Sequence, residues 1–257
     1  MPGIAGQHWP DALAHPAFAL LAPLTAQLPR VPALADWQRL PPVHTQSGLP
    51  LQCVDPSSLS RYYEAEIYEL GRIATRDDWH DCFNALVWHS YPRSKAALNA
   101  LHYRLLPDTG QGPRGPVRDA ATLFDECGLI VPYSDPALLE LLVGHEWSTL
   151  FVDRRDDWGR HIDALVFGHA TFENLLAPFT GLTGKCWPVQ VEPAFFALPL
   201  AARMAQLDSQ VCTSLSAGWL TTPRQLPPLP YLGIPGWWPQ QDASFYANHS
   251  YFRSRRR

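Results

Sequence analysis

The chain has 257 residues, of which 46% are hydrophobic and 17% are charged, and its formal net charge is −4. This composition supports a sizeable core in one large domain, and it excludes a dominantly disordered chain. No run of about 18 apolar residues is present, so we expect no membrane-spanning helix. The basic residues are scattered except for an arginine-rich end, so the sequence gives no strong nucleic-acid-binding signal elsewhere. The clustered arginines of that end are Arg253, Arg255, Arg256 and Arg257.

Five cysteines, at positions 53, 82, 127, 186 and 212, form an odd set without a Cys-x-x-Cys pair. We interpret them as free thiols in a reducing compartment. The first residues also lack the basic and apolar segments of a secretory signal, and we therefore expect a cytoplasmic protein.

Proline organises the chain: its 26 prolines are about twice the usual share of roughly 5%. They concentrate in residues 10–56, 107–116 and 223–239. The first and last stretches also carry tryptophans, which pure linkers lack, so we interpret them as arms packed on a core. The expected organisation is one domain over residues 1–257, with an N-terminal arm (1–40), a core (41–222) and a C-terminal arm (223–257).

The first half of the core is predicted to contain a hairpin and two helices. Residues 61–76 are predicted to form a β-hairpin that turns at Leu70–Gly71. A helix is predicted over about residues 79–90, and a second one over about 94–106 after a proline stop. The first of these helices is indicated by four apolar residues on one face: Trp79, Phe83, Leu86 and Val87. A Gly/Pro loop follows over residues 108–116.

The second half is predicted to contain one more hairpin and three helices. Residues 120–133 are predicted as the hairpin, with its turn at Cys127–Gly128. The helices are predicted over residues 136–144, 158–176 and about 198–215. The expected fold is therefore a helix-rich α+β single domain with one or two β-hairpins, because the strands are too few for a doubly wound sheet.

The densest group of polar residues lies between positions 79 and 102. His80 and Asn84 share a face of the first predicted helix, and Lys95, Asn99 and His102 share a face of the second. Histidine binds metals or moves protons near neutral pH, asparagine orients a substrate, and lysine attracts an anionic oxygen. The functional hypothesis is that these five residues line a catalytic cleft. The alternative is that they hydrogen-bond across the helix junction.

A hairpin followed by a helix with His and Asn also resembles the ββα metal nucleases. In those enzymes a histidine near the hairpin activates water, and an asparagine on the helix helps to position the metal or the base. His80 and Asn84 are closer together than that pattern requires.

Two further groups contain candidate metal ligands. His169 and Glu173 are four residues apart on a predicted helical face, but a metal site needs a third or fourth ligand, so His80 or His102 would have to converge on His169. Asp81 is a weak additional candidate. The alternative for His169 and Glu173 is a simple hydrogen bond.

The other group consists of Arg118–Asp119 with Asp125–Glu126 beside a glycine. Paired acids of this kind can hold Mg²⁺ or Ca²⁺ through oxygen ligands. The alternative is that they are ordinary turn residues.

Four segments carry a resemblance to a known family: TRDDWHDCFNALVWHSYPRSKAALN, RDAATLFDECG, FGHATFENLLAP and LPYLGIPGWWP. Over about residues 37–252 the chain resembles the uncharacterised bacterial family called domain of unknown function 3025. The resemblance implies a soluble bacterial protein whose fold is one unit, and it names no catalytic residue. Its recognisable blocks coincide with the polar groups described above.

Two hypotheses about function follow. The first is a soluble enzyme with a polar cleft lined by His, Asn and Lys, which hydrolyses a phosphoester with the help of a divalent metal. The second is a non-catalytic binding or scaffold protein that uses a surface rich in Trp and Pro. The sequence names neither a substrate nor a partner.

Overall fold

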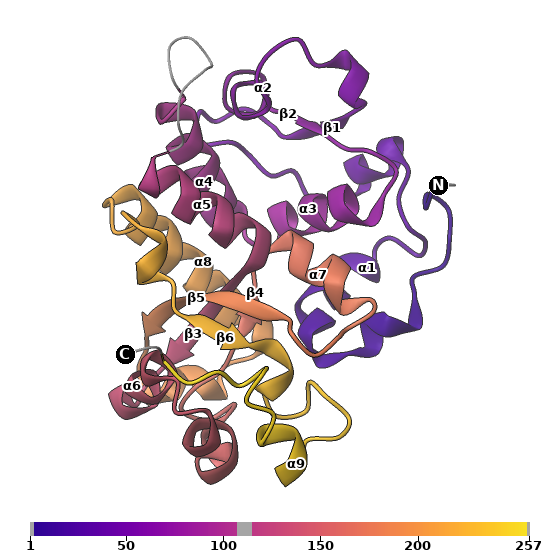
Figure 1. Ribbon diagram of the computed structural model, residues 1–257. Helices are drawn as coiled ribbons and strands as arrows, with labels where there is room; N and C mark the ends of the chain where they lie inside the picture. Colours follow the sequence, from indigo (N-terminus) through magenta and orange to yellow (C-terminus); the bar gives the residue numbers. More distant parts are fainter. Residues whose placement is uncertain (1–2, 107–114, 256–257) are drawn as a thin grey trace.

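A mixed four-stranded sheet lies in the middle of the computed structural model, which describes residues 3–106 and 115–255 (Figure 1). The strand order is β4–β3–β5–β6, in which β3 and β5 are parallel and both outer pairs are antiparallel. The first five residues of β3 are buried, as is typical of a parallel strand covered on both faces. The strands are β3 (Gly128–Tyr133), β4 (Leu165–Val166), β5 (Thr183–Gln190) and β6 (Pro228–Pro230).

A second sheet contains only two short parallel strands, β1 (Gln52–Val54) and β2 (Arg72–Ala74), which are connected through the helix α2 (Tyr63–Leu70). The hairpin predicted over residues 61–76 is therefore wrong. Gly71 has a φ of 68° and donates its N–H to carbonyls of the last turn of α2, so it ends a helix instead of turning a hairpin. The ββα arrangement of the metal nucleases is lost with that hairpin.

Helices make up most of the remaining structure, and the helix-rich α+β class is confirmed. The helices predicted over residues 79–90, 94–106, 136–144 and 198–215 correspond to α3, α4, α6 and α8. No helix in the described part of the chain is long and apolar enough to cross a membrane. The bounds are α1 (Ala22–Thr25), α3 (Trp79–Ser90), α4 (Pro92–Arg104), α5 (Pro116–Cys127), α6 (Pro136–Gly144), α7 (His169–Leu175), α8 (Leu200–Ser216) and α9 (Ala243–Tyr246).

Two other predictions of secondary structure are wrong. The hairpin expected over residues 120–133 is helix α5 followed by strand β3, because Pro116 and Asp119 provide a favourable first helical turn. The long helix expected over residues 158–176 is irregular up to β4, and α7 begins only at His169. Most of the loop predicted over residues 108–116 lies outside the described residues, and Pro116 already belongs to α5.

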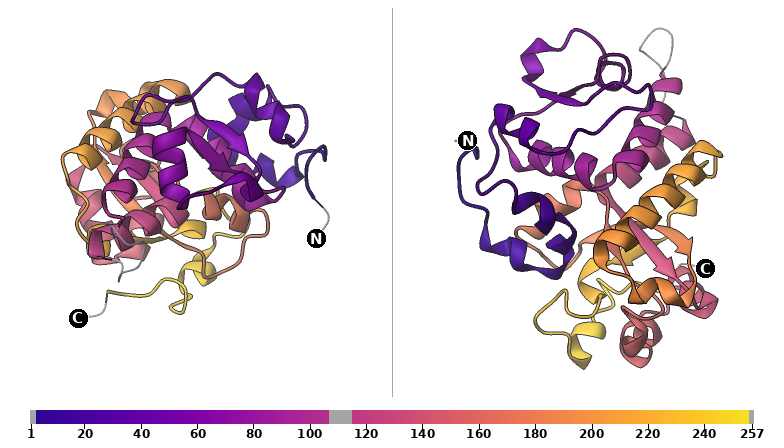
Figure 2. Two further views of the ribbon diagram at one scale, coloured as in Figure 1. Left: turned by 90° about the horizontal axis from the view of Figure 1, so that it is seen from above. Right: turned by 180° about the vertical axis from the view of Figure 1, so that it is seen from behind.

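Both terminal segments pack on the rest of the domain. In Figure 1 and Figure 2 the N-terminal segment, in indigo, lies alongside α3. The ring of Phe18 in this segment packs in a tilted arrangement against the rings of Phe83 and Phe172. The C-terminal segment, in yellow, runs from β6 to α9, and Tyr231 and Trp237 within it are buried. Aromatic side chains of both arms thus belong to the same hydrophobic core as the central sheet.

Candidate metal centre

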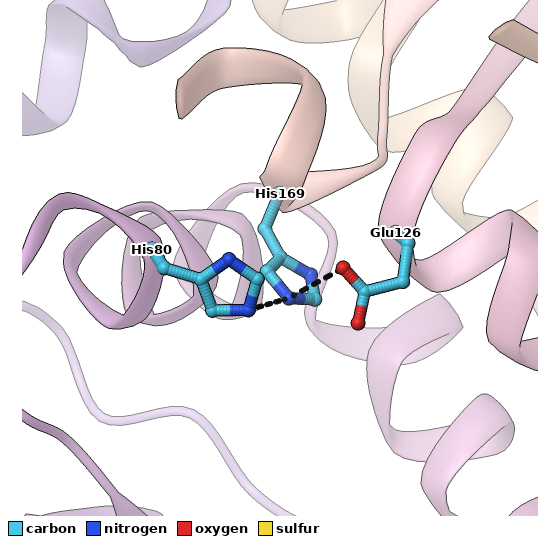
Figure 3. A group of neighbouring side chains, drawn as sticks. All are labelled: His80, Glu126 and His169. Atoms are coloured by element: carbon cyan, nitrogen blue, oxygen red, sulfur yellow. Dashed lines mark hydrogen bonds and ion pairs between the residues drawn. The ribbon is translucent and has the colours of Figure 1, made fainter. Parts of the chain in front are cut away.

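Three helices bring two histidines and one glutamate to a common point (Figure 3). His80 lies in the first turn of α3, Glu126 in the last turn of α5, and His169 is the first residue of α7. Helices α3 and α5 both pack against α7, which explains how residues up to 89 positions apart become neighbours. In Figure 3 the three side chains point toward one another.

The distances within this cluster suit a metal ion. The Nε2 atoms of His80 and His169 are 3.0 Å apart, and Nε2 of His169 is 3.5 Å from Oε2 of Glu126. One ligand atom from each residue lies within 4.8 Å of the other two. Two ligands of a tetrahedral Zn²⁺ ion, each about 2.1 Å from it, are about 3.4 Å apart. Without an ion, the same geometry permits a hydrogen bond between two neutral imidazoles.

His80 is oriented by an acidic side chain behind it. Its Nδ1 lies 3.1 Å from Oε2 of Glu173, and we assign Nδ1 as the donor in this bond. The lone pair of Nε2 then faces His169 and Glu126. Such carboxylate–histidine pairs commonly fix a metal-binding imidazole. Glu173, which the sequence suggested as a metal ligand, is therefore not one of the three clustered ligands. It contacts the cluster through its hydrogen bond to His80.

His169 is held in its neutral form by its surroundings. Burial lowers its pKa to about 4, and the nearby charge of Asp125 only partly opposes this shift. The backbone carbonyl of Asp125 also faces the ring, although Nδ1 makes no hydrogen bond of standard geometry with the described residues. The neutral ring is the form that binds metals, and it dominates at neutral pH.

Glu126 carries a negative charge that its position does not favour. Burial and the neighbouring charge of Asp125 raise its pKa, while His80 opposes them. The residue also lies in the last turn of α5, where the helix dipole disfavours an anion. A cation bound between Glu126 and the two histidines would relieve both effects.

The candidate ligands line a polar pocket of about 470 Å³, which other chemically useful side chains also reach. Of the five predicted catalytic residues, His80, Asn84 and His102 line this pocket. Lys95 and Asn99 are buried and do not line it. The helix junction therefore brings together three of the five at one pocket and leaves two outside it.

The two residues outside the pocket hold its wall in place. Lys95 pairs with Asp125, and its Nζ donates to Oδ1 of Asn84 at 2.9 Å. The side-chain amide of Asn99 donates to Oε2 of Glu64 at 2.8 Å. Because Lys95 already neutralises Asp125, its charge is not available to a substrate in the way that the sequence suggested.

Asp81, the third residue suggested as a metal ligand, has other partners. Its carboxylate accepts from Nε of Arg76 at 2.8 Å and from Nη2 at 2.9 Å. Burial alone would raise the pKa of Asp81, but the Arg76 guanidinium holds it below its usual range. Asp81 lines the pocket, but its carboxylate is paired with Arg76. The carboxylate that joins the two histidines is that of Glu126.

The sequence singles out Glu126 only as one of two paired acids that can hold Mg²⁺ or Ca²⁺, and neither Glu126 nor Arg118 is among the predicted site residues. A signal for both exists: Arg118, Thr122 and Glu126 follow each other at intervals of four on α5 and line the same pocket. Recognising this polar stripe requires α5 to be read as a helix, which the hairpin prediction prevented.

Residues 52–256 match the family described as "Protein of unknown function (DUF3025)". The matched range covers most of the chain and includes His80, Glu126 and His169. No curated protein and no solved structure is significantly similar to the chain.

Proposed function

The chain belongs to the DUF3025 family, and because that membership specifies no activity, we propose a function from its own residues: it is a metal-dependent hydrolase that acts on phosphoesters. The observation that carries this proposal is the convergence of His80, Glu126 and His169 on one point at the wall of a polar pocket.

The chemistry of these three side chains favours a divalent first-row ion, with Zn²⁺ as the first candidate. Two imidazoles and one carboxylate are a common ligand set of catalytic zinc. Three protein ligands leave a coordination position for water. The partial exposure of His80 and Glu126, at 30% and 42% of their side chains, allows that position to face the pocket.

The reaction follows from this arrangement. An ion held by His80, Glu126 and His169 would lower the pKa of a bound water to about 7 and would so supply a nucleophile at neutral pH. The oxygen of this water would form the new bond to phosphorus, while the bond between phosphorus and the leaving alcohol oxygen breaks. The leaving oxygen takes up a proton, for which His102, buried in the pocket wall, is the candidate donor.

Metal binding is the first test of this proposal. The purified protein is stripped with a chelator, titrated with ZnCl₂ in a calorimeter, and analysed for bound metal after dialysis. We expect about one equivalent per chain, and at least a 100-fold weaker affinity in His80→Ala and His169→Ala. Glu126→Gln keeps the shape of the side chain and should also weaken binding. His161→Ala, a change at an exposed histidine, is the matched control.

Hydrolysis is the second test. Bis(p-nitrophenyl) phosphate and p-nitrophenyl phosphate are offered to the stripped and the reloaded protein. We expect turnover only with metal, and its loss in His80→Ala and in His102→Ala. Circular dichroism confirms that each variant is folded. A protein that binds no metal, or whose binding is indifferent to all three ligand variants, contradicts the proposal.

The alternative of a scaffold protein required an exposed surface rich in Trp and Pro. Trp37 and Trp237 are only 6% and 7% exposed, and both belong to the hydrophobic core. These side chains stabilise the fold instead of presenting a recognition surface, so the structure offers this alternative less support than the sequence did.

A further inference from the structure

We propose that Arg118 forms an anion-binding subsite beside the metal centre, and that the substrate is a phosphoester that carries a second phosphate group, as a nucleotide with phosphates at two positions does. This inference rests on the proposed function for the reacting group. The subsite itself can be tested without any catalysis.

Arg118 is a buried cation that has no acidic partner within the described residues. Its side chain lines the pocket, and the residue is only 9% exposed. Nη2 donates to the hydroxyl of Tyr62 at 3.0 Å, and the guanidinium lies 5.6 Å from the centre of the Tyr62 ring. No carboxylate in residues 3–106 or 115–255 forms an ion pair with it. Because a buried charge without a counter-ion is unfavourable, an anionic ligand is the natural partner.

The other cations near this pocket are already neutralised. The guanidinium of Arg76 is bound to Asp81, and the ammonium of Lys95 is bound to Asp125. Within the described part of the chain, Arg118 is thus the arginine or lysine at this pocket whose charge is left for a ligand.

The position of Arg118 on α5 sets the distance between the two anionic groups of that ligand. Arg118 and Glu126 are eight residues apart on the pocket-facing stripe of one helix, with Thr122 between them. At about 1.5 Å per residue, their Cα atoms are about 12 Å apart along the helix axis. A substrate that reaches both must extend along α5, with its reacting phosphate at the metal centre and its second anion at the guanidinium.

A phosphate fits the second position better than a single carboxylate does. The guanidinium is a planar fork that binds two oxygens of a phosphate at once, and Tyr62 holds one side of the fork. Tyr62, which is 47% exposed, lines the same pocket, and its ring lies against the guanidinium. We therefore assign Tyr62 as the positioning residue of Arg118.

The subsite is tested first by binding of inorganic phosphate to the metal-free protein, measured by calorimetry. We expect Arg118→Gln to bind phosphate at least 10-fold more weakly than the wild type. Arg118→Lys keeps the charge but loses the fork, and should lie between the two. Tyr62→Phe removes one hydrogen bond and should weaken binding about threefold. Arg160→Gln, a change at an exposed arginine, is the control that should bind as the wild type does.

The substrate class is tested with a matched pair of chromogenic esters. Thymidine 5′-(p-nitrophenyl phosphate) and the same compound with an added 3′-phosphate differ only in the second anion. We expect the metal-loaded wild type to prefer the 3′-phosphate form by at least 10-fold in kcat/KM. The preference should fall to about one in Arg118→Gln, while kcat/KM for the simpler ester changes little.

The outcomes separate this inference from the proposed function. If the wild type and Arg118→Gln each hydrolyse the two esters equally well, the inference that the substrate carries a second phosphate is wrong. The proposed hydrolase function is not affected by that result. Phosphate binding that does not depend on Arg118 overturns the subsite. Phosphate binding that depends on Arg118 in a protein that binds no metal supports the subsite and overturns the hydrolase. Arg118→Lys and Tyr62→Phe keep the test decisive where Arg118→Gln fails to fold.

Discussion

Gly168 lies so close to Glu126 that a Cβ atom at position 168 would come within 2.4 Å of the Glu126 carbonyl oxygen. The same Cβ would also lie 2.4 Å from the backbone nitrogen of Gly128. Since Gly168 directly precedes His169, this contact between two backbones sets the separation of two candidate ligands. The absence of a side chain at Gly168 is therefore part of the candidate metal centre.

Gly168→Ala is expected to weaken metal binding without changing a ligand side chain. The added methyl group meets backbone atoms that cannot rotate away, so α5 and α7 must move apart. We expect a destabilisation of about 1–3 kcal/mol, as is usual for overpacking, together with at least a 10-fold loss of Zn²⁺ affinity. Calorimetry and urea denaturation measure the two effects. Gly144→Ala adds a methyl group that meets only ordinary contacts, and it should change neither.

Tyr231→Phe should also loosen the packing of the end of α5 against α7. The buried hydroxyl of Tyr231 donates to the Cys127 carbonyl at 2.8 Å and lies 2.7 Å from Oγ1 of Thr171. It thus ties the end of α5 to α7 through the C-terminal arm. Removing it leaves buried polar groups unpaired, which costs about 1–3 kcal/mol in urea denaturation. An unchanged unfolding free energy would show that the arm does not hold these two helices.

Phe83→Ala is expected to reduce the free energy of unfolding by about 3–5 kcal/mol, because it deletes a large buried side chain. Phe83 is fully buried, and its ring lies 5.8 Å from that of Phe18 and 5.6 Å from that of Phe172. Urea denaturation provides the measurement. Val152→Ala, at a residue that is 45% exposed, is the control and should change stability far less. A loss below about 1 kcal/mol for Phe83→Ala would mean that α3 packs through another face.

The stability of the fold should fall as the pH is lowered from 6.5 toward 4, in part because of His89. Burial lowers the pKa of His89 to about 4, while a hydrogen bond to the Pro41 backbone opposes this shift. Below the ordinary pKa, the unfolded chain binds a proton that the folded chain excludes, so protonation favours unfolding. At about 1.4 kcal/mol per pH unit, the contribution is at most about 3.5 kcal/mol.

This pH dependence is checked by comparing the wild type with His89→Asn at pH 7 and pH 5. The variant should lose less stability between the two values, because its side chain cannot take up the proton. His169 has a similarly lowered pKa and contributes to the loss in both proteins, so the informative quantity is their difference. His161→Asn controls for the removal of an exposed histidine. Parallel curves for the wild type and His89→Asn would contradict the prediction.

The sequence alone predicts the helices whose apolar periodicity is complete, such as α3 and α8, and it singles out His80 and His169. It mistakes Gly71 for a hairpin turn because a glycine that ends a helix and a glycine that turns a hairpin look alike locally. It names His80 or His102 as the residue that would converge on His169, but it cannot choose between them, because the contact of His80 with His169 depends on how α3 and α7 pack across 89 residues. Tertiary packing, which leaves no local pattern, decides that part of the site.

The prolines of β6 have a consequence for the molecule in a crowded solution. Within the described residues, the central sheet ends on one side at β4, which has only two residues, and on the other at β6. Pro228 and Pro230 have no backbone N–H, so β6 cannot offer a complete ladder to a strand from another molecule. A short edge and a proline-blocked edge together protect this sheet against edge-to-edge aggregation.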